Sequence, residues 1–471
     1  MTSNATRGWT IALTGIGSLM AALDTLVVAA ALTTIRTDLG ASIEELEWTV
    51  NAYNLSFAVL LVTGAALGDR FGRRRLYAAG LALFAVASAA CALAPDVGSL
   101  IAGRALQGAG AALLMPLGLA LLSAAFPPEK RGSAIGMFSA VTGIAVALGP
   151  LVGGAVVEGI AWEWIFWLNV PIGLLAAPLA LSKMKESFGS DTAIDFPGLA
   201  LITGGAFGVV WALVRANNAG WYSLEVIGSM LAGAALIAAF VAWQRRARAP
   251  MLPPRLFRRR SFAAGNGAIF FTFASLFGCV FLFAQFMQTS LGFGPLDAGL
   301  RLIPWTITFI VIAPVAGALA DRIGERPLIL TGLLLQAGGL IWIATIAEPA
   351  LAYSEIVIPL VVAGCGISMA IPAGQNSVVG GVSIGELGKA AGANSTMREL
   401  GGVFGIAVVV AVFAAAGSYA SPEAFSDGFA AAVGVGAGLA ALGALVALAL
   451  PSRRALPEIA PNQPATEAAQ P

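Results

Sequence analysis

Two charged residues lie inside long apolar stretches of this chain. Asp24 interrupts the run from Gly8 to Ile35, and Arg104 lies near the start of the run 98–124. A charged side chain at the centre of a bilayer costs about 3 kcal/mol or more, so such residues are usually kept for a purpose. A carboxylate that can take up a proton inside a membrane-spanning helix indicates ion-coupled transport. The alternative for Arg104 is a side chain that extends to the outer headgroups.

Both charges are expected at a similar depth. Counted from the membrane face on the N-terminal side, Asp24 lies about 22 Å in at 1.5 Å per residue. The helix that carries Arg104 starts at the opposite face of the membrane. In a core about 30 Å thick, this places Arg104 about 21 Å from the face on the N-terminal side. An arginine favours the charged carboxylate and burial favours the neutral one, so a movement between states could bind or release a proton. Gln107 shares the helix face of Arg104.

The composition is that of a polytopic membrane protein. Of the 471 residues, 58% are hydrophobic and only 11% are charged, against about 25% charged in an average soluble chain. The chain has no histidine, and Cys91, Cys279 and Cys365 all lie in apolar runs. These features argue against a metal site or a disulfide framework. A net charge of +1 indicates no nucleic-acid partner, and residues 1–7 lack a signal-peptide pattern.

Apolar runs bounded by charges or turn residues predict fourteen membrane-spanning helices. The predicted spans are residues 9–35, 46–68, 76–94, 98–124, 132–157, 162–182, 195–214, 223–244, 261–288, 295–319, 327–347, 354–380, 396–417 and 428–450. The final segment, 452–471, is rich in proline and alanine, and we expect it to be a disordered cytoplasmic tail.

The loop charges predict the orientation. With the N-terminus inside, the even-numbered loops and the two terminal segments carry all but four of the 26 lysines and arginines, whereas the odd-numbered loops are acidic. Arg398 counts among the loop residues in this scheme, and only Arg36, Arg104, Arg215 and Arg301 fall elsewhere. This distribution follows the positive-inside rule and predicts that both termini are cytoplasmic.

The chain also repeats internally. GDRFGRRRL at 68–76 returns as ADRIGERPL at 320–328, and GAGAALLMPLG at 108–118 returns as GCGISMAIPAG at 364–374, at nearly the same separation. Two unrelated segments with one separation indicate duplicated halves. The predicted division is a six-helix bundle at 1–182, two inserted helices and a basic linker at 183–260, and a second six-helix bundle at 261–451.

These strings resemble those of the major facilitator superfamily, in its fourteen-helix drug:proton antiporter branch. The loop ALGDRFGRRRLY matches the superfamily signature G-x-L-x-D-R-x-G-R-R, except that Ala65 replaces the first glycine. The string GMFSAVTGIAVALGPLVGG resembles the antiporter motif G-x8-G-x3-G-P-x2-G-G, with Ala145 in place of one glycine. LDTLVVAAALTTI, WEWIFWLNVPIG and GANSTMRELGGVFGIAV extend the likeness over nearly the whole chain. The matching residues of the antiporter motif are Gly136, Gly149, Pro150, Gly153 and Gly154.

The resemblance implies the major facilitator fold, an all-α polytopic membrane protein with two six-helix bundles and two inserted helices. It implies transport by alternating access, in which the bundles rock about a central cavity, and no enzymatic activity. The Asp-Arg turn and its second copy would act as a latch for the outward-facing state. A basic loop that only fixes topology is the alternative. The latch residues are Asp69, Arg70, Gly72 and Arg73, with Asp321 and Arg322 in the second copy.

The predicted substrate cavity combines polar and aromatic residues. The span 261–288 is dense in phenylalanine, and many of these rings would simply meet lipid or neighbouring helices. Others could hold flat lipophilic cations through stacking and cation–π contact. The residues assigned to the cavity are Gln107, Asn54, Phe277, Phe281, Gln285, Gln288 and Asn376.

We therefore predict a proton-coupled antiporter that exports lipophilic drugs or antibiotics across the bacterial inner membrane. Asp24 and Arg104 would form its proton-coupling site. Its partners would be the lipid bilayer, a small lipophilic substrate and protons; we expect a monomer that needs no cofactor. The alternatives are a narrow exporter of one endogenous metabolite and a membrane sensor without transport.

Overall fold

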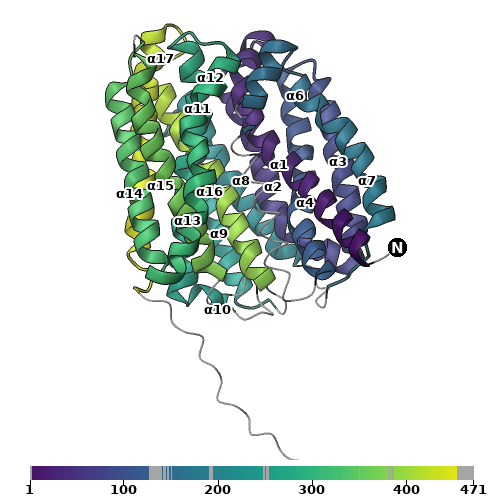
Figure 1. The fold of residues 1–471 in the computed structure, drawn as a ribbon. Helices are drawn as coiled ribbons and strands as arrows, with labels where there is room; N and C mark the ends of the chain where they lie inside the picture. The colour runs from purple at the N-terminus through teal and green to yellow at the C-terminus, as the bar shows by residue number, and fades with distance from the viewer. Residues whose placement is uncertain are drawn as a thin grey trace, which may run out of the picture.

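The computed structural model of the chain is a bundle of long helices (Figure 1). It describes residues 3–126, 141, 145, 148, 149, 151–189, 195–247, 250, 254–349, 351–379, 382 and 387–452. The backbone alone is described at residues 3, 4, 26, 62, 214, 217, 218, 318, 321, 379, 387–389 and 391. No β-strand occurs in these described residues.

Along the chain, the helices form an N-terminal half, a helical hairpin and a C-terminal half. The N-terminal half contains α1 (Ser3–Leu39), α2 (Ile43–Phe71), α3 (Arg73–Ala92), α4 (Val97–Ala125), α6 (Trp164–Trp167) and α7 (Asn169–Lys183), with a further helical segment at residues 151–159. The inserted hairpin contains α8 (Phe196–Ala219) and α9 (Leu224–Gln244). The C-terminal half contains α10 (Pro254–Phe257), α11 (Arg260–Thr289), α12 (Pro295–Arg301), α13 (Ile303–Ile323), α14 (Glu325–Ile346), α15 (Tyr353–Val379), α16 (Leu387–Ala416) and α17 (Pro422–Ala447).

Most of the predicted spans have matching helices. Eleven described helices are long and apolar enough to cross a membrane, and the number rises to thirteen if the bent helices α1 and α2 each count as one span. Every predicted span except 132–157 coincides with a helix, or with a short and a long helix in succession. The larger part of 132–157 lies outside the described residues. The all-helical membrane protein is confirmed, while the count of fourteen spans stays a prediction.

Turn residues decide where several helices begin. Ser42 and Glu45 form a reciprocal capping box at the start of α2, and the Glu45 carboxylate accepts the Ser42 amide at 2.8 Å. Gly72, between α2 and α3, has φ +107°, and Gly324, between α13 and α14, has φ +85°. Glycine adopts these angles without steric strain. The two copies of the Asp-Arg motif therefore form the same kind of turn.

The two ends of the bundle differ in charge. The lower end in Figure 1, which we call the basic end, carries the N-terminus and the loops with most of the arginines. The upper end, which we call the acidic end, carries the starts of α2 and α17 with their glutamates. Residues at the basic end include Arg70, Arg73, Arg74, Arg75, Lys183 and Arg322, and those at the acidic end include Glu44, Glu45, Glu158 and Glu423.

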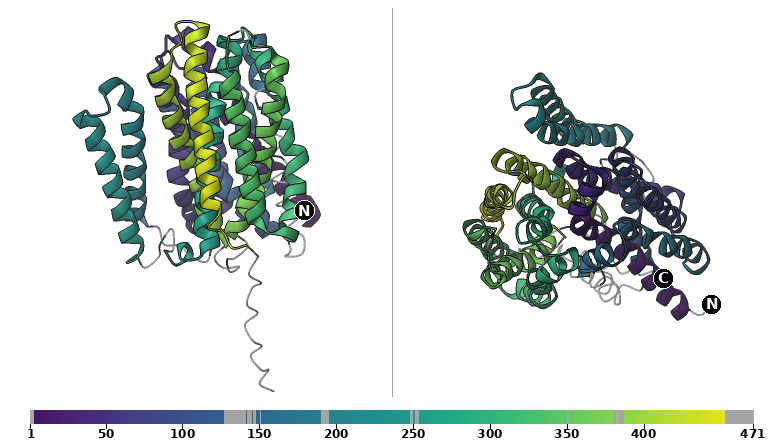
Figure 2. Two further views of the ribbon diagram at one scale, coloured as in Figure 1. Left: turned by 90° about the vertical axis from the view of Figure 1, so that its left-hand side faces the viewer. Right: turned by 90° about the horizontal axis from the view of Figure 1, so that it is seen from above.

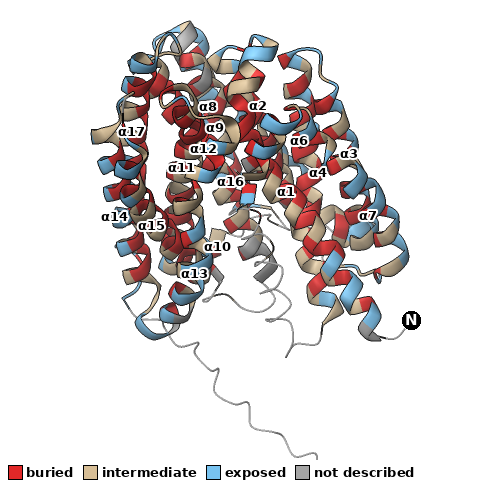
Figure 3. Cartoon of the chain, turned by 45° about the horizontal axis from the view of Figure 1, so that its top comes forward, coloured by how far each residue is buried: buried red, intermediate tan, exposed pale blue. Residues whose placement is uncertain are grey.

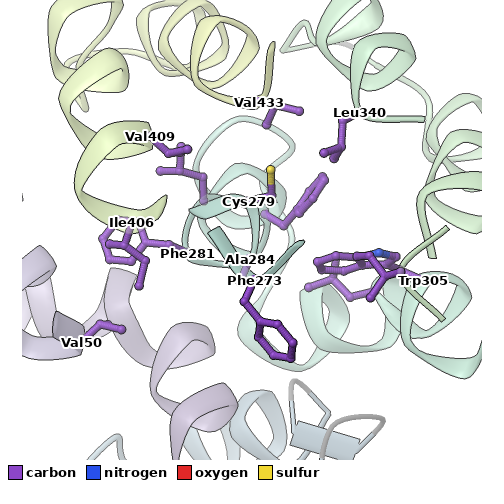
Figure 4. Packing of buried hydrophobic residues seen from close by; sticks show 14 of the residues in the cluster. Val50, Phe273, Cys279, Phe281, Ala284, Trp305, Leu340, Ile406, Val409 and Val433 are labelled. Carbon is purple, nitrogen blue, oxygen red and sulfur yellow. The ribbon is translucent and has the colours of Figure 1, made fainter. Parts of the chain in front are cut away.

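A shared apolar core joins the halves. The largest buried cluster contains Val27 and Leu32 of α1 together with many side chains of α11, α15 and α17. Phe286 and Phe429 stack within it, with ring centroids 4.1 Å apart. Figure 4 shows part of this cluster around Cys279, and in Figure 3 the buried residues line the faces on which the helices meet.

The inserted hairpin stands at the side of the bundle (Figure 2). Of its two helices, α8 contacts both α2 of the N-terminal half and α16 of the C-terminal half. Arg215 of α8 forms ion pairs with Glu44 at 3.1 Å and with Glu225 at 2.9 Å. Trp48 and Trp211 pack with ring centroids 5.9 Å apart beside these charges. Arg215, an exception to the loop-charge pattern, thus fastens the hairpin to α2.

Candidate transport site

Asp24 and Arg104 form a direct ion pair in the N-terminal half. Asp24 lies on α1 and Arg104 on α4, and Arg104 Nη1 contacts Asp24 Oδ2. The relative exposure of the two residues is 3% and 0%. The structure thus brings together the two charges that the depth estimate placed at one level. A side chain that extends from Arg104 to the headgroups is excluded.

Uncharged side chains complete the surroundings of Asp24. Gln107 Nε2 donates to Asp24 Oδ1 at 2.7 Å, and Asn169 Nδ2 donates to the same oxygen at 3.4 Å. The Ser88 hydroxyl oxygen lies beside both amides, accepting from Gln107 at 3.2 Å and from Asn169 at 3.3 Å. Both carboxylate oxygens of Asp24 therefore accept hydrogen bonds. Asn169 belongs to the WEWIFWLNVPIG string, whereas Ser88 carried no sequence signal.

Arg104 has partners other than Asp24. Its Nε donates to the Thr49 carbonyl at 3.1 Å, and its Nη1 also donates to Gln107 Oε1 at 2.6 Å. The guanidinium carbon lies 4.3 Å from the centroid of the Tyr53 ring, within the range of a cation–π contact. These contacts do not require a charge on Asp24. The arginine would remain held if the carboxylate became neutral.

This arrangement suits a group that changes its protonation state inside the membrane. Removing one charge of a buried ion pair commonly costs about 3–5 kcal/mol, because the other charge is left without compensation. Here a carbonyl, an amide and an aromatic ring remain around Arg104, which lowers that cost. No cluster of metal-ligating residues is found in the described part of the chain. Within the described residues, the site offers one titratable carboxylate paired with one arginine.

The first Asp-Arg turn is held by the segment that follows α7. Asp69 Oδ1 pairs with Arg73 Nε at 2.7 Å. The Glu186 carboxylate accepts the Arg74 amide at 2.8 Å, and a Cβ on Gly72 would lie 2.9 Å from Glu186. The chain therefore reverses at Gly72 in direct contact with the Glu186 carboxylate. Glu186 lies in a loop outside every motif, so sequence reasoning missed it.

The second Asp-Arg turn is described in less detail, but the surroundings of its glycine can be compared with those of Gly72. Arg322 is exposed, and the side chain of Asp321 lies outside the described residues. A Cβ on Gly324 would meet only the Ser452 carbonyl oxygen, at 3.7 Å. The two copies therefore share a backbone turn, but the first is packed more tightly.

Glycines of the antiporter motif allow the helical segment 151–159 to pack closely against α1 of its own half and against the start of α12 in the C-terminal half. A Cβ on Gly153 would lie 2.9 Å from the Val27 carbonyl oxygen of α1. A Cβ on Gly154 would lie 2.2 Å from the Pro295 carbonyl oxygen, at the start of α12. Neither site leaves room for a side chain. Gly149 is buried, while Gly136 and Pro150 lie outside the described residues.

The residues predicted to line the cavity occupy different surroundings. Gln107 belongs to the Asp24 network. Asn54 on α2 is 1% exposed, and neither atom of its side-chain amide has a hydrogen-bond partner. Phe277 is half-buried beside Phe273, with ring centroids 5.8 Å apart, and Asn376 is also half-buried.

The remaining predicted cavity residues are engaged within the bundle. Phe281 and Gln285 are buried in the C-terminal half, and Gln285 Oε1 accepts the hydroxyl of Tyr419. Gln288 Nε2 donates to the Ala30 carbonyl on α1 at 3.1 Å. In this conformation Gln285 and Gln288 connect helices, and their role in substrate binding stays a prediction.

Comparison with known families decides the class of the protein. The sequence profile of the Major Facilitator Superfamily matches residues 14–406 and 266–470. The chain is a member of the Major Facilitator Superfamily. It is 33% identical over 425 residues to the tetracenomycin C resistance and export protein of Streptomyces glaucescens, covering 89% of this chain and 79% of that protein. It is 35% identical over 409 residues to the probable actinorhodin transporter of Streptomyces coelicolor, covering 84% and 70%.

Other relatives and solved structures agree with this membership. The multidrug resistance protein Stp of Mycobacterium tuberculosis is 34% identical over 414 residues, covering 88% of this chain and 77% of that protein. The crystal structure of the POT family transporter PepTSo superimposes with a TM-score of 0.69 at 15% identity, covering 93% of this chain and 97% of that one. At that identity the likeness shows the fold alone. This superfamily member is therefore a multi-pass membrane transporter and not an enzyme, as the motifs predicted.

The structure also corrects the placement of Arg398. The loop-charge argument put it in a loop, but α16 begins at Leu387, so Arg398 and Glu399 lie three turns inside a helix. Glu399 is 4% exposed and pairs with Arg398 at 2.7 Å. Sequence reasoning counted the arginine as topogenic and assigned no role to the glutamate. The adjacent opposite charges within an apolar run were the signal that could have identified them.

Proposed function

We propose that this transporter exports lipophilic drugs or antibiotics in exchange for protons. The observation that carries the proposal is the buried pair of Asp24 and Arg104, in which the carboxylate's partners among the described residues all come from the N-terminal half. A buried ionisable residue in a membrane helix marks an ion or substrate pathway by default. The printed names of relatives, which include antibiotic export and multidrug resistance proteins, support the direction of transport and the class of substrate.

The proposed cycle follows from the two states of Asp24. When the site is open to the outside, a proton entering from that side neutralises the carboxylate and weakens its attraction to Arg104, which stays on the Thr49 carbonyl and the Tyr53 ring. The loosened contact between α1 and α4 favours release of substrate. Deprotonation on the inside restores the pair and lets substrate load again. The coupling requires only that the two access states differ in their affinity for the proton.

The acidic end is closed in this conformation, and the distribution of loop charges supports our proposal that this end faces outward. The Leu296 amide of α12 donates to Glu158 Oε2 at 2.9 Å, so the two halves are joined there by a hydrogen bond. The Arg36 guanidinium of α1 lies 4.0 Å from the Tyr419 ring of the C-terminal half. Reopening to the outside would break these contacts.

Reconstituted protein tests the proposal directly. Proteoliposomes with an imposed pH gradient should accumulate a lipophilic drug against its concentration gradient, and an uncoupler should abolish the accumulation. A screen of dyes and antibiotics in a host lacking its own pumps, with and without the uncoupler, would supply the substrates. Drug accumulation that persists with the uncoupler would contradict proton coupling, and no transport of any compound would revive the sensor alternative.

A narrow exporter is the second candidate. It is favoured by the names of the tetracenomycin C and actinorhodin relatives, each of which refers to one antibiotic. The same screen separates the two, because a narrow exporter would lower the accumulation of one structural class and leave all others unchanged.

A further inference from the structure

A second buried carboxylate lies on the C-terminal side of the boundary between the halves. Glu399 of α16 shares a helix face with Val403 and Ile406, which follow at i+4 and i+7. Val403 is fully buried in a cluster that contains Leu55 and Val59 of α2. This face of α16 therefore packs against the N-terminal half.

Helix α2 connects this face of α16 with the Asp24 site. The ring of Tyr53 lies against Arg104, and Leu55, two residues further along α2, is buried in one cluster with Val403. Figure 4 shows Ile406, on the Glu399 face of α16, near Val50, which precedes Asn54 by one turn of α2. The Glu399 face of α16 thus packs against the helix that also contacts Arg104 through Tyr53.

Glu399 is less completely bonded than Asp24. Arg398 Nε and Nη2 both contact Glu399 Oε1, at 2.8 and 2.7 Å. Glu399 Oε2 takes no part in this ion pair. A carboxylate can accept up to about four hydrogen bonds. The guanidinium of Arg398 also lies 5.7 Å from the centroid of the Phe273 ring, which provides a second contact for its charge. Glu399 can therefore bind a further cation while the charge of Arg398 keeps its contact with the Phe273 ring.

Unsatisfied polar atoms lie on the same two helices. Asn54 Oδ1 and Nδ2 and Thr396 Oγ1 are buried and have no hydrogen-bond partner in the protein. Thr396 precedes Glu399 by one turn and is 4% exposed. Buried polar atoms without partners are costly, and in native proteins they usually have a reason. A ligand that carries hydrogen-bonding groups would satisfy them.

We propose that Glu399, Asn54 and Thr396 form a subsite for a monocationic amphiphile between α2 and α16. Glu399 Oε2 binds the positive charge, and Asn54 and Thr396 bind polar groups of the same molecule. The inference rests on the proposed drug export and adds a division of roles, in which Asp24 binds the proton and Glu399 binds the cationic substrate.

Two probes of different charge test the subsite. Ethidium is a permanent monocation with amino groups, and chloramphenicol is a neutral amphiphile with hydroxyl and amide groups. Binding to detergent-purified full-length protein would be measured by fluorescence anisotropy for ethidium and by equilibrium dialysis for chloramphenicol. Glu399→Gln should raise the Kd of ethidium about tenfold or more, the loss of one charge-assisted contact, and change that of chloramphenicol less than about twofold.

Matched variants separate the cation site from general damage. Glu423→Gln removes the same charge from an exposed position of the C-terminal half and should leave both Kd values unchanged. Glu399→Asp keeps the charge and should weaken ethidium binding only in part, which provides the test if Glu399→Gln does not fold. Asp24→Asn should retain ethidium binding.

Several outcomes would overturn the inference. One is that the Glu399→Gln protein binds ethidium with the wild-type Kd. Another is that a monodisperse Glu399→Gln protein loses affinity for ethidium and for chloramphenicol by the same factor. The inference also fails if the wild-type protein exports chloramphenicol but does not bind ethidium, and drug export then still stands. A wild-type protein that binds neither probe and exports no drug contradicts the proposed function itself.

Discussion

The two halves of the transporter contain the same kinds of feature, but they hold them differently. Each half has a buried carboxylate beside an arginine, and each has an Asp-Arg turn that reverses at a glycine with positive φ. In the N-terminal half Asp24 has hydrogen bonds to both oxygens, and the turn is held by Glu186. In the C-terminal half both Arg398 contacts with Glu399 fall on one carboxylate oxygen.

The difference teaches that a repeat can preserve backbone geometry while side-chain chemistry diverges. A positive-φ glycine is demanded by the turn itself, so it persists in both copies. Pairing of charges depends on neighbours, and these differ between the halves. We infer that the N-terminal site, in which both carboxylate oxygens are bonded, is built for a small occupant such as a proton. The C-terminal site, in which Arg398 contacts one oxygen only, would take a larger one.

The largest expected effect is at Asp24. Asp24→Asn keeps the side-chain size but removes the proton-binding group, and uphill efflux driven by a pH gradient should fall to the level of empty liposomes. Membrane insertion should be normal, since a neutral amide is easier to bury than a carboxylate. Asp427→Asn, at an exposed position of α17, is the matched control. Efflux at the wild-type rate in Asp24→Asn would place the proton site elsewhere and remove the contrast between the halves.

The next effect is at Arg104. Arg104→Ala leaves Asp24 buried without its counter-charge, which favours the neutral carboxylate and hinders proton release, so the initial rate of efflux should fall about tenfold or more. Arg104→Lys should restore only part of the rate, because an ammonium cannot reproduce the contacts of Nε and Nη1 at once. Rates in proteoliposomes with equal protein incorporation give the comparison. Full rescue by lysine would show that charge alone is needed.

The sequence predicted the architecture and the N-terminal site better than the C-terminal one, for physical reasons. Hydrophobic length and loop charge are local properties, so the spans could be predicted from them. The depths of Asp24 and Arg104 could be counted along single helices. Glu399 falls inside the predicted span 396–417, but its partner is the adjacent Arg398, which was counted with the loop charges, so no local pattern assigned the glutamate a role. Ser88 and Glu186 act through distant parts of the chain, which no local pattern reveals.

A smaller effect is expected where the two Asp-Arg turns are compared. Asp69→Asn removes the pair with Arg73, whose side chains are partly exposed, so a cost of about 1 kcal/mol and a two- to fivefold slower efflux are expected. Asp321→Asn should be tolerated better, since Glu325 and Pro327 replace two arginines of the first copy. Paired efflux rates at equal expression are the measurement. Negligible effects at both sites would reduce the turns to topogenic signals.

The smallest effect, on stability, is at the two turn glycines. Gly72→Ala and Gly324→Ala both place a Cβ on a backbone with positive φ, which costs about 1–2 kcal/mol. At Gly72 the added Cβ would also lie 2.9 Å from Glu186, whereas at Gly324 its nearest neighbour is 3.7 Å away. Gly72→Ala should therefore lower the thermal unfolding midpoint in detergent more than Gly324→Ala does. Gly40→Ala is the control, because Gly40 has φ +64° and open space around its Cβ position. Its loss should be smaller than that of Gly72→Ala, since no neighbouring atom meets its added Cβ. Equal losses at all three glycines would mean that Glu186 moves aside freely, and that the first turn is no more tightly held than the second.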